Sequence, residues 1–280
     1  MLFGVYTCIV MLHPTMSASQ HQWQDNIVRA EKYIYNERDT VKNIIIGSSL
    51  SLRLIPDSLP QFYNMAFAGQ GIFDGLKILN HQKNPPKNVF IETNLVFREE
   101  SKEFTSGLFS FLGYNIKKYC VSLRTDKEPL VFIYPLVQSV IHSKRDIIGY
   151  AQPKSIKEDS SERELTKNLL QIQVTNYSKL PDTSLANKQF SILTDEVTLL
   201  KSKGVKVIFF EMPINPLLVQ SPLEKLIRTK FYMYFPKSEN NYIDIPDCTN
   251  YVTGDGLHLN PDEAAIYTSY FKENTKKYLK

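Results

Sequence analysis

Two stretches from opposite ends of the chain carry side chains that could cooperate in nucleophilic catalysis. Ser49 follows a Gly-Ser pair at the end of the isoleucine-rich run Asn43–Ile46, and Asp255 stands three residues before His258. A serine hydroxyl is a weak nucleophile and needs a base within hydrogen-bond reach. His258 can take its proton, and Asp255 can bind the other ring nitrogen and fix the tautomer. The residue types therefore predict attack by Ser49 on an acyl carbon, provided that the fold brings the two stretches together.

Such attack places negative charge on the carbonyl oxygen, and a donor aimed at that oxygen stabilises it by about 3 kcal/mol. Three donors are candidates: the backbone N–H of Ser49, the backbone N–H of Gly69 and the side-chain amide of Asn94. Glycine lacks a Cβ, so Gly69 would let the backbone approach a substrate closely. We expect no metal ion and no organic cofactor, because this chemistry needs neither.

Short apolar runs alternate with helical patterns, and the runs end in small or amide residues. In an open parallel sheet, ligands bind beyond the carboxyl ends of the strands, so this order suits the candidate residues. It predicts a doubly wound α/β layer fold. Strands are expected at 43–46, 62–66, 88–94, 205–210 and 242–245. Helices are expected at 22–35, 49–54, 72–80 and 185–203. A last helix is expected to begin with Asn260 as N-cap, Pro261 in first position and Glu263 as capping-box acid.

Taken in order, Gly47-Ser48-Ser49-Leu50, Gly69, Asn94 and Asp255-x-x-His258 resemble the four sequence blocks of the SGNH/GDSL hydrolase superfamily. The resemblance spans residues 43–271. It implies a three-layer α/β/α sandwich of the flavodoxin type, with a mainly parallel sheet. It also implies the roles of the site residues: Ser49 as nucleophile, His258 as base, Asp255 as its orienting group, and Ser49, Gly69 and Asn94 as the oxyanion hole.

The chain departs from the family pattern in two blocks. The usual Gly-Asp-Ser-Leu is Gly47-Ser48-Ser49-Leu50 here, a form that resembles the branch acting in O-acylation of cell-wall and exported polysaccharides. That branch implies a membrane-bound O-acyltransferase as partner. The third block, usually Gly-x-Asn-Asp, reads Glu92-Thr93-Asn94-Leu95 and keeps only the asparagine. We expect Glu92 to be buried against Arg53 or Arg98, or to point away from the site.

The expected function is that of a serine esterase acting on acyl esters, above all acetyl esters, through an acyl-serine intermediate. If a sugar hydroxyl takes the place of water, the same intermediate makes the protein an O-acyltransferase for an envelope or exported polysaccharide. A non-catalytic binding protein on the same fold is a third hypothesis, which the altered third block favours. An unrelated α/β protein is the fourth, because each motif alone also occurs in plain turns, loops and helix caps.

Composition argues against several other classes. The net charge of +4, from 33 basic and 29 acidic residues, is too small and too scattered for nucleic-acid binding. Glycines at 69, 71 and 75 give G-x-G-x-x-x-G instead of a dinucleotide fingerprint, and neither glycine turn has the Gly-Lys-Ser/Thr ending of a P-loop. Cys8, Cys120 and Cys248 form no C-x-x-C, so a zinc or thioredoxin-like site is not expected. Cys120 and Cys248 could pair in an oxidising compartment or remain free thiols.

The N-terminal region and the middle of the chain fall outside the alternating pattern. Residues 2–12 are apolar, uncharged and too short to span a bilayer comfortably, which suits a signal peptide or anchor within 1–19, with Ser17–Ser19 offering a cleavage site. This predicts an exported or membrane-anchored envelope protein. The alternative is an ordinary N-terminal helix or strand of a cytoplasmic protein. The hydrolase-like domain would then be 20–280, with a helical insertion at about 98–185 that covers the core, forms a lid or lines a groove.

Overall fold

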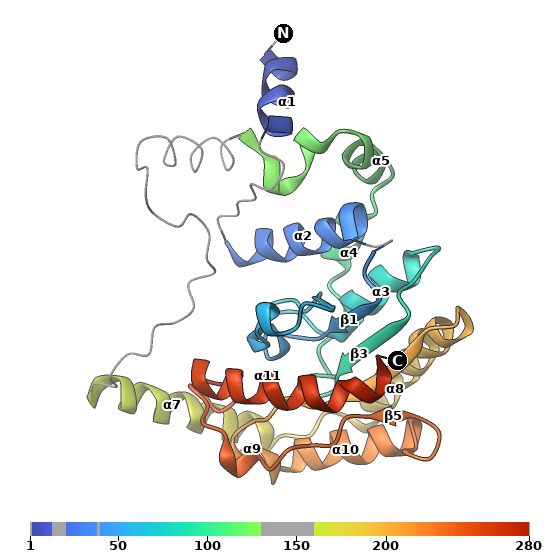
Figure 1. Ribbon diagram of the computed structural model, residues 1–280. Coiled ribbons are helices and arrows are strands. Elements are labelled where there is room, and N and C mark those ends of the chain that lie inside the picture. The colour runs from blue at the N-terminus through green and yellow to red at the C-terminus, as the bar shows by residue number, and fades with distance from the viewer. Residues whose placement is uncertain (1, 13–20, 38–39, 130–159, 280) are drawn as a thin grey trace. The chain divides into compact units, whose positions relative to one another are not determined.

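The computed structural model describes residues 2–12, 21–37, 40–129 and 160–279 (Figure 1). The chain divides into two compact units, which we call the helical unit (residues 1–37 and 102–152) and the sheet unit (residues 38–101 and 153–280). The predicted cleavage site at 17–19 and residues 130–159 of the predicted insertion lie outside the described residues. All five candidate site residues belong to the sheet unit, so its fold determines their positions.

The sheet unit contains a parallel sheet, whose five described strands lie in the order β2-β1-β3-β4-β5. Every neighbouring pair runs parallel. This is the flavodoxin-type order, in which the chain reverses direction across the sheet between β1 and β3, and such switch points are where open α/β sheets bind ligands. The strands are β1 (Asn43–Ile46), β2 (Phe62–Asn64), β3 (Asn88–Glu92), β4 (Lys206–Phe210) and β5 (Asn241–Tyr242).

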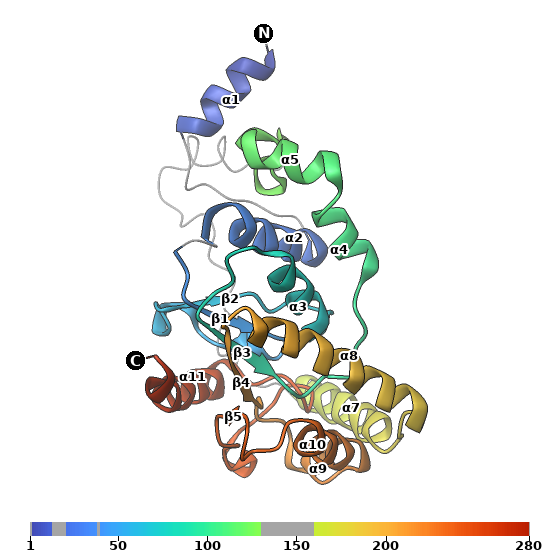
Figure 2. The ribbon, with the colours of Figure 1, turned by 90° about the vertical axis from the view of Figure 1, so that its right-hand side faces the viewer.

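Helices cover both faces of this sheet. Figure 2 shows α11 on one side of the strands and α3 with α8 on the other. The predicted three-layer α/β/α fold is therefore confirmed. The α-helices of the sheet unit are α3 (Ile72–His81), α7 (Ser160–Tyr177), α8 (Thr183–Ser202), α9 (Pro216–Val219), α10 (Pro222–Tyr234) and α11 (Pro261–Thr275). Short 3-10 turns complete it: η2 (Ser51–Arg53), η3 (Pro56–Ser58), η6 (Cys248–Asn250) and η7 (Lys276–Tyr278).

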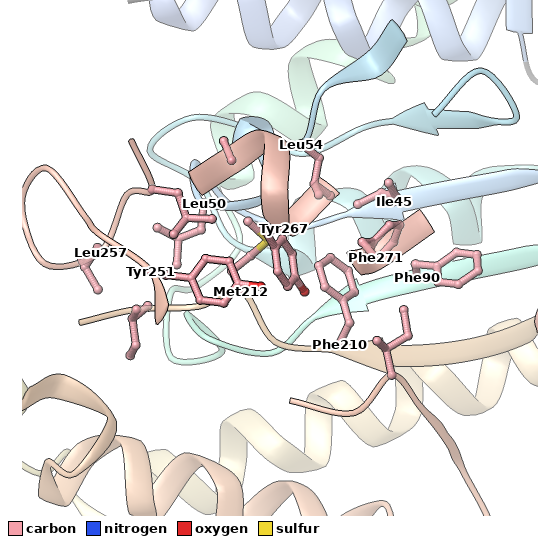
Figure 3. Packing of buried hydrophobic residues seen from close by; sticks show 14 of the residues in the cluster. Ile45, Leu50, Leu54, Phe90, Phe210, Met212, Tyr251, Leu257, Tyr267 and Phe271 are labelled. Carbon is pink, nitrogen blue, oxygen red and sulfur yellow. The ribbon is translucent and has the colours of Figure 1, made fainter. Parts of the chain in front are cut away.

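The central strands are apolar on both faces because helices cover both, which is usual for parallel sheets. Under α11, the strand residues Ile45, Phe90 and Phe210 are buried with Tyr267 and Phe271 of that helix. The Phe271 ring packs edge-on against Phe210 and Phe90, with ring centroids 5.0 and 5.8 Å apart (Figure 3). Burying a large side chain of this kind stabilises the fold by about 1.5–3 kcal/mol. The aromatic cluster therefore fixes α11, and the loop that precedes it, against the sheet.

The same cluster reaches the loops that carry the candidate residues. Leu50, the residue after Ser49, is 1% exposed, and Leu257, the residue before His258, is 8% exposed, and both belong to this cluster (Figure 3). The apolar neighbour of each of these two candidate residues is thus anchored in the core. This leaves Ser49 and His258 at the edge of the core, where they are only partly covered.

The helical unit is built from two distant segments of the chain. Its helices are α1 (Leu2–Leu12), α2 (Gln22–Lys32), the π-helical continuation η1 (Tyr33–Glu37), α4 (Lys102–Leu108), α5 (Phe111–Tyr119) and the 3-10 turns η4 (Val121–Leu123) and η5 (Thr125–Lys127). Trp23 meets Phe104 edge-on at 5.6 Å, and buried Glu31 binds the Lys117 Nζ (2.7 Å) and the Thr125 N–H (2.8 Å). Across the described ranges, no helix is both long enough and apolar enough to cross a membrane.

The structure differs from several local expectations. The predicted insertion is divided, since α4 and α5 belong to the helical unit while α7 belongs to the sheet unit. Pro261 begins α11 as predicted, but the N-cap Asn260 makes no capping hydrogen bond with its side chain, so the expected capping box is not formed. All three cysteines are free thiols, which is one of the two states expected for Cys120 and Cys248.

Candidate active site

Ser49 lies in a tight turn beyond the carboxyl end of β1. The N–H of Ser48 donates to Glu92 Oε2 (2.9 Å), the N–H of Leu50 to Ser48 Oγ (3.2 Å), and the N–H of Ser51 to Glu92 Oε2 (3.1 Å). These bonds hold the turn against Glu92. The N–H groups of Arg53 and Leu54 then bind carbonyls three residues back, so the predicted helix at 49–54 is only the single 3-10 turn η2. Among the described residues, the N–H of Ser49 has no partner, so it stays available to a ligand.

Glu92, the last residue of β3, is fully buried beneath this turn. Besides the two backbone bonds, its Oε1 accepts a hydrogen bond from Ser48 Oγ at 2.7 Å. The expectation of an arginine partner is not met for Arg98, which donates to the carbonyl of Gln70 at 3.3 Å. A glutamate at the end of a buried strand indicates that it needs hydrogen-bonding partners, because such a residue is almost never fully buried unless it is paired, but it does not indicate which residues these are.

His258 lies on a closed loop between η6 and α11. Thr253 and Leu259 form an antiparallel bridge, and the N–H of Gly254 donates to the carbonyl of His258 at 2.9 Å. At the tip of the loop, Gly256 has φ +94°, a conformation that residues with a Cβ rarely adopt. The loop is therefore held in a defined shape before the ring interactions are considered.

Asp255 fixes the orientation of the His258 ring. Its Oδ1 accepts the N–H groups of Leu257 (2.9 Å) and His258 (2.8 Å), while its Oδ2 lies 2.7 Å from His258 Nδ1. Burial alone would raise the pKa of Asp255. The hydrogen bonds from the His258 ring and the two backbone N–H groups outweigh burial and hold that pKa at about 2. The carboxylate is thus ionised at neutral pH, and it favours a proton on Nδ1 of the ring.

The other ring nitrogen, His258 Nε2, lies 2.8 Å from Ser49 Oγ. The structure therefore brings together three of the predicted residues in one continuous chain of hydrogen bonds from Ser49 through His258 to Asp255. With the proton held on Nδ1, Nε2 carries the lone pair and can accept the hydroxyl proton of Ser49.

Gly69 follows β2, whose backbone continues beside β1. The N–H of Met65 donates to the carbonyl of Ile45 (2.8 Å), and the N–H of Phe67 donates to the carbonyl of Gly47 (3.2 Å). This ladder leads the chain to Gly69 beyond the carboxyl end of β1, where the residue is exposed and has φ +76°. In the part of the chain that the structure describes, the N–H of Gly69 also has no partner.

Asn94 is placed differently from the expected oxyanion donor. Its side chain is fully buried and pairs with the backbone of Met212: Nδ2 donates to the carbonyl (2.9 Å), and Oδ1 accepts the N–H (2.8 Å). The amide thereby joins the chain after β3 to the chain after β4. Because it mimics a backbone strand pair, Asn94 has a structural role that the sequence pattern did not indicate.

No metal-binding cluster of histidine, cysteine, aspartate or glutamate occurs within the described residues. No known protein family matches the chain, and no curated protein matches it. Among solved structures, the chain is similar to a crystal structure described as a putative acylhydrolase from Bacteroides fragilis. The identity is 12% and the TM-score 0.46, over 93% of this chain and 100% of that chain. At these values the similarity carries no assignment of function, which must come from the site itself.

Proposed function

We propose that the protein is a serine esterase of the SGNH/GDSL type, which cleaves an acyl ester through an acyl-Ser49 intermediate. The observation that carries the proposal is the hydrogen-bonded chain of Ser49 Oγ, His258 Nε2, His258 Nδ1 and Asp255 Oδ2, with separations of 2.8 and 2.7 Å. These distances lie within the range in which a nucleophile passes its proton to a base.

In the first half of the reaction, Ser49 Oγ attacks the ester carbonyl carbon and its proton moves to His258 Nε2. The imidazolium is stabilised by the Asp255 carboxylate. As the tetrahedral intermediate collapses, the carbon–oxygen bond to the alcohol breaks, and His258 returns its proton to the leaving alkoxide. Water then attacks the acyl-serine, His258 takes a proton from it, and Ser49 Oγ recovers that proton when the carboxylic acid leaves.

The oxyanion is assigned to the backbone N–H groups of Ser49 and Gly69. Both lie beyond the carboxyl ends of neighbouring strands, and neither has a partner among the described residues. Each such donor lowers the activation free energy by about 3 kcal/mol. Asn94 is a weaker candidate for a third donor, because its buried amide already binds the backbone of Met212.

The acceptor decides between the two reactions that share this intermediate. Water gives an esterase, for which an acetyl ester is our proposed substrate, whereas a sugar hydroxyl gives an O-acyltransferase for an envelope polysaccharide. A place at the cell envelope is supported by α1, which contains no charged residue and exposes Leu2, Met11 and Leu12 by 84%, 69% and 76%. An envelope location would also give a membrane-bound O-acyltransferase partner access to the protein.

The test is covalent labelling with a fluorophosphonate, measured by intact mass, together with release of p-nitrophenol from p-nitrophenyl acetate. We expect one adduct per chain in the unmodified protein and none in Ser49→Ala or His258→Ala. Ser202→Ala and His81→Ala, which change the same residue types elsewhere in the sheet unit, should label normally. A folded protein that neither labels nor hydrolyses the ester would refute the proposal and favour a binding role.

A further inference from the structure

We infer that Glu92 is a positioning residue for the nucleophile: from the neighbouring strand, it holds the turn so that, of the backbone N–H groups of residues 48–51, that of Ser49 is left for the substrate. The inference rests on the proposed function and deepens it. It assigns a role to a buried acid that the proton transfers described above do not use.

The first observation is how completely Glu92 is committed to the turn. Its carboxylate is fully buried, and its two oxygens receive three hydrogen bonds, at 2.7, 2.9 and 3.1 Å, from Ser48 and Ser51. Those two residues stand on either side of Ser49 and Leu50. Because a buried polar group costs free energy unless it is hydrogen-bonded, moving the turn away from Glu92 would destabilise the fold.

The second observation is that the backbone reserves space for this carboxylate. A Cβ placed on Gly47 would lie 2.6 Å from Glu92 Oε2 and 2.8 Å from the Cβ of Glu92. It would also clash with Ser51 Oγ. Gly47 has no left-handed backbone conformation that would otherwise call for glycine. The glycine before the two serines therefore leaves room for the close approach of Glu92 and of Ser51, which donates to it.

The two observations imply that the reach of the side chain matters more than its charge. Both backbone N–H groups donate to one oxygen, Oε2, and Ser48 Oγ faces the other. A glutamine can keep this pattern, since its carbonyl oxygen can take the place of Oε2 and Ser48 Oγ can accept from its NH₂ group. An aspartate keeps the carboxyl group but is one methylene too short to reach all three donors.

The experiment measures the second-order rate of fluorophosphonate labelling at Ser49 in Glu92→Asp, Glu92→Gln and Gly47→Ala, counted per folded molecule by circular dichroism. We expect Glu92→Asp and Gly47→Ala to label about 100-fold more slowly, which is the loss that a displacement of about 1 Å of a reacting group can cause. Glu92→Gln should stay within about tenfold of the unmodified rate, because only the strength of its hydrogen bonds changes. Such rescue by the uncharged residue of equal length would not follow from a loss of stability alone.

Glu196→Asp is the matched control. Glu196 on α8 is also buried and also accepts bonds from another element, Lys77 Nζ (2.6 Å) and Asn80 Nδ2 (2.5 Å) of α3, but it does not contact the Ser49 turn. The substitution Glu196→Asp should lower the melting temperature without slowing the labelling of Ser49. Normal labelling in both Glu92→Asp and Gly47→Ala would overturn this inference and leave the esterase proposal intact. A folded unmodified protein that does not label would instead refute the proposed function, and this inference with it.

Discussion

Replacing Asp255 with asparagine should lower the rate of catalysis about 10⁴-fold while leaving the fold unchanged, because it reverses the tautomer of His258. The asparagine carbonyl can keep the place of Oδ1, which accepts the backbone N–H groups of Leu257 and His258 at 2.9 and 2.8 Å. Its NH₂ group then replaces Oδ2, 2.7 Å from His258 Nδ1. A donor in that place requires Nδ1 to accept, so the ring proton moves to Nε2 and faces Ser49.

The opposite orientation of the amide is disfavoured by the same two backbone groups. Turning the NH₂ group toward them would leave two N–H donors facing a donor, at a cost of about 1–3 kcal/mol each. The wrong tautomer therefore dominates, and His258 loses the lone pair that accepts the Ser49 proton. The corresponding change in a serine protease triad lowers kcat by about 10⁴, or roughly 5 kcal/mol of activation free energy.

The assay is the rate of p-nitrophenyl acetate hydrolysis and of fluorophosphonate labelling, with nitrogen-15 NMR of His258 to identify the protonated ring nitrogen. Asp247→Asn is the matched control, because Asp247 likewise accepts the backbone N–H of Thr249 two residues later but does not contact the ring. The Asp247→Asn protein should hydrolyse p-nitrophenyl acetate at the rate of the unmodified protein. If the rate of Asp255→Asn lay within tenfold of the rate of the unmodified protein, the proposed role of Asp255 in orienting His258 would be refuted.

The pKa of Asp255 is held at about 2, so this carboxylate stays ionised above pH 4. Any loss of activity on acidification above pH 4 is therefore expected to come from another group.

Three further predictions concern stability. Burial raises the pKa of Asp74 to about 6, so the folded state binds this proton more tightly than the unfolded state. The free energy of unfolding, measured by urea denaturation, should therefore fall by about 3 kcal/mol as pH rises from about 4 to about 6, and Asp74→Asn should show no such fall. Phe271→Ala should lower the free energy of unfolding by about 3–5 kcal/mol in the same assay, since its ring is fully buried among aromatic neighbours, and a loss below 1 kcal/mol would contradict that packing. Asn94→Ala should cost about 3 kcal/mol by leaving the buried N–H and carbonyl of Met212 unpaired, and an unchanged melting temperature would argue against the structural role of Asn94.

The elements of the sheet could be predicted because each central strand is a short, continuous apolar run that ends at a polar or glycine residue. The runs around Ile45 and Phe90 give strands with the expected starts. The edge strand β5 is only Asn241–Tyr242, shorter than expected, because few backbone partners hold an edge. Periodicity also indicated α3 and α8, whose buried faces recur at helical spacing.

The candidate site could be predicted in part, since serine, aspartate and histidine carry their chemistry in their side chains. The sequence could not indicate that Glu92 lies under the Ser49 turn, because that contact depends on the register between β1 and β3, in which Ile46 lies opposite Ile91. Nor could it indicate that Asn94 turns toward Met212, which requires the register of β4. Contacts between side chain and distant backbone follow from sheet pairing, which one sequence does not determine.

The separation of Ser49 from His258 also has a consequence for the timing of reactivity. The two residues are 209 positions apart, and His258 lies on the loop just before α11. During synthesis, Ser49 therefore emerges long before its proposed base, and contacts between such distant residues form late in folding. A nascent or partly folded chain would carry an ordinary, unreactive hydroxyl. Labelling of Ser49 would then serve as a reporter of completed folding, because it requires α11 to have docked on the sheet.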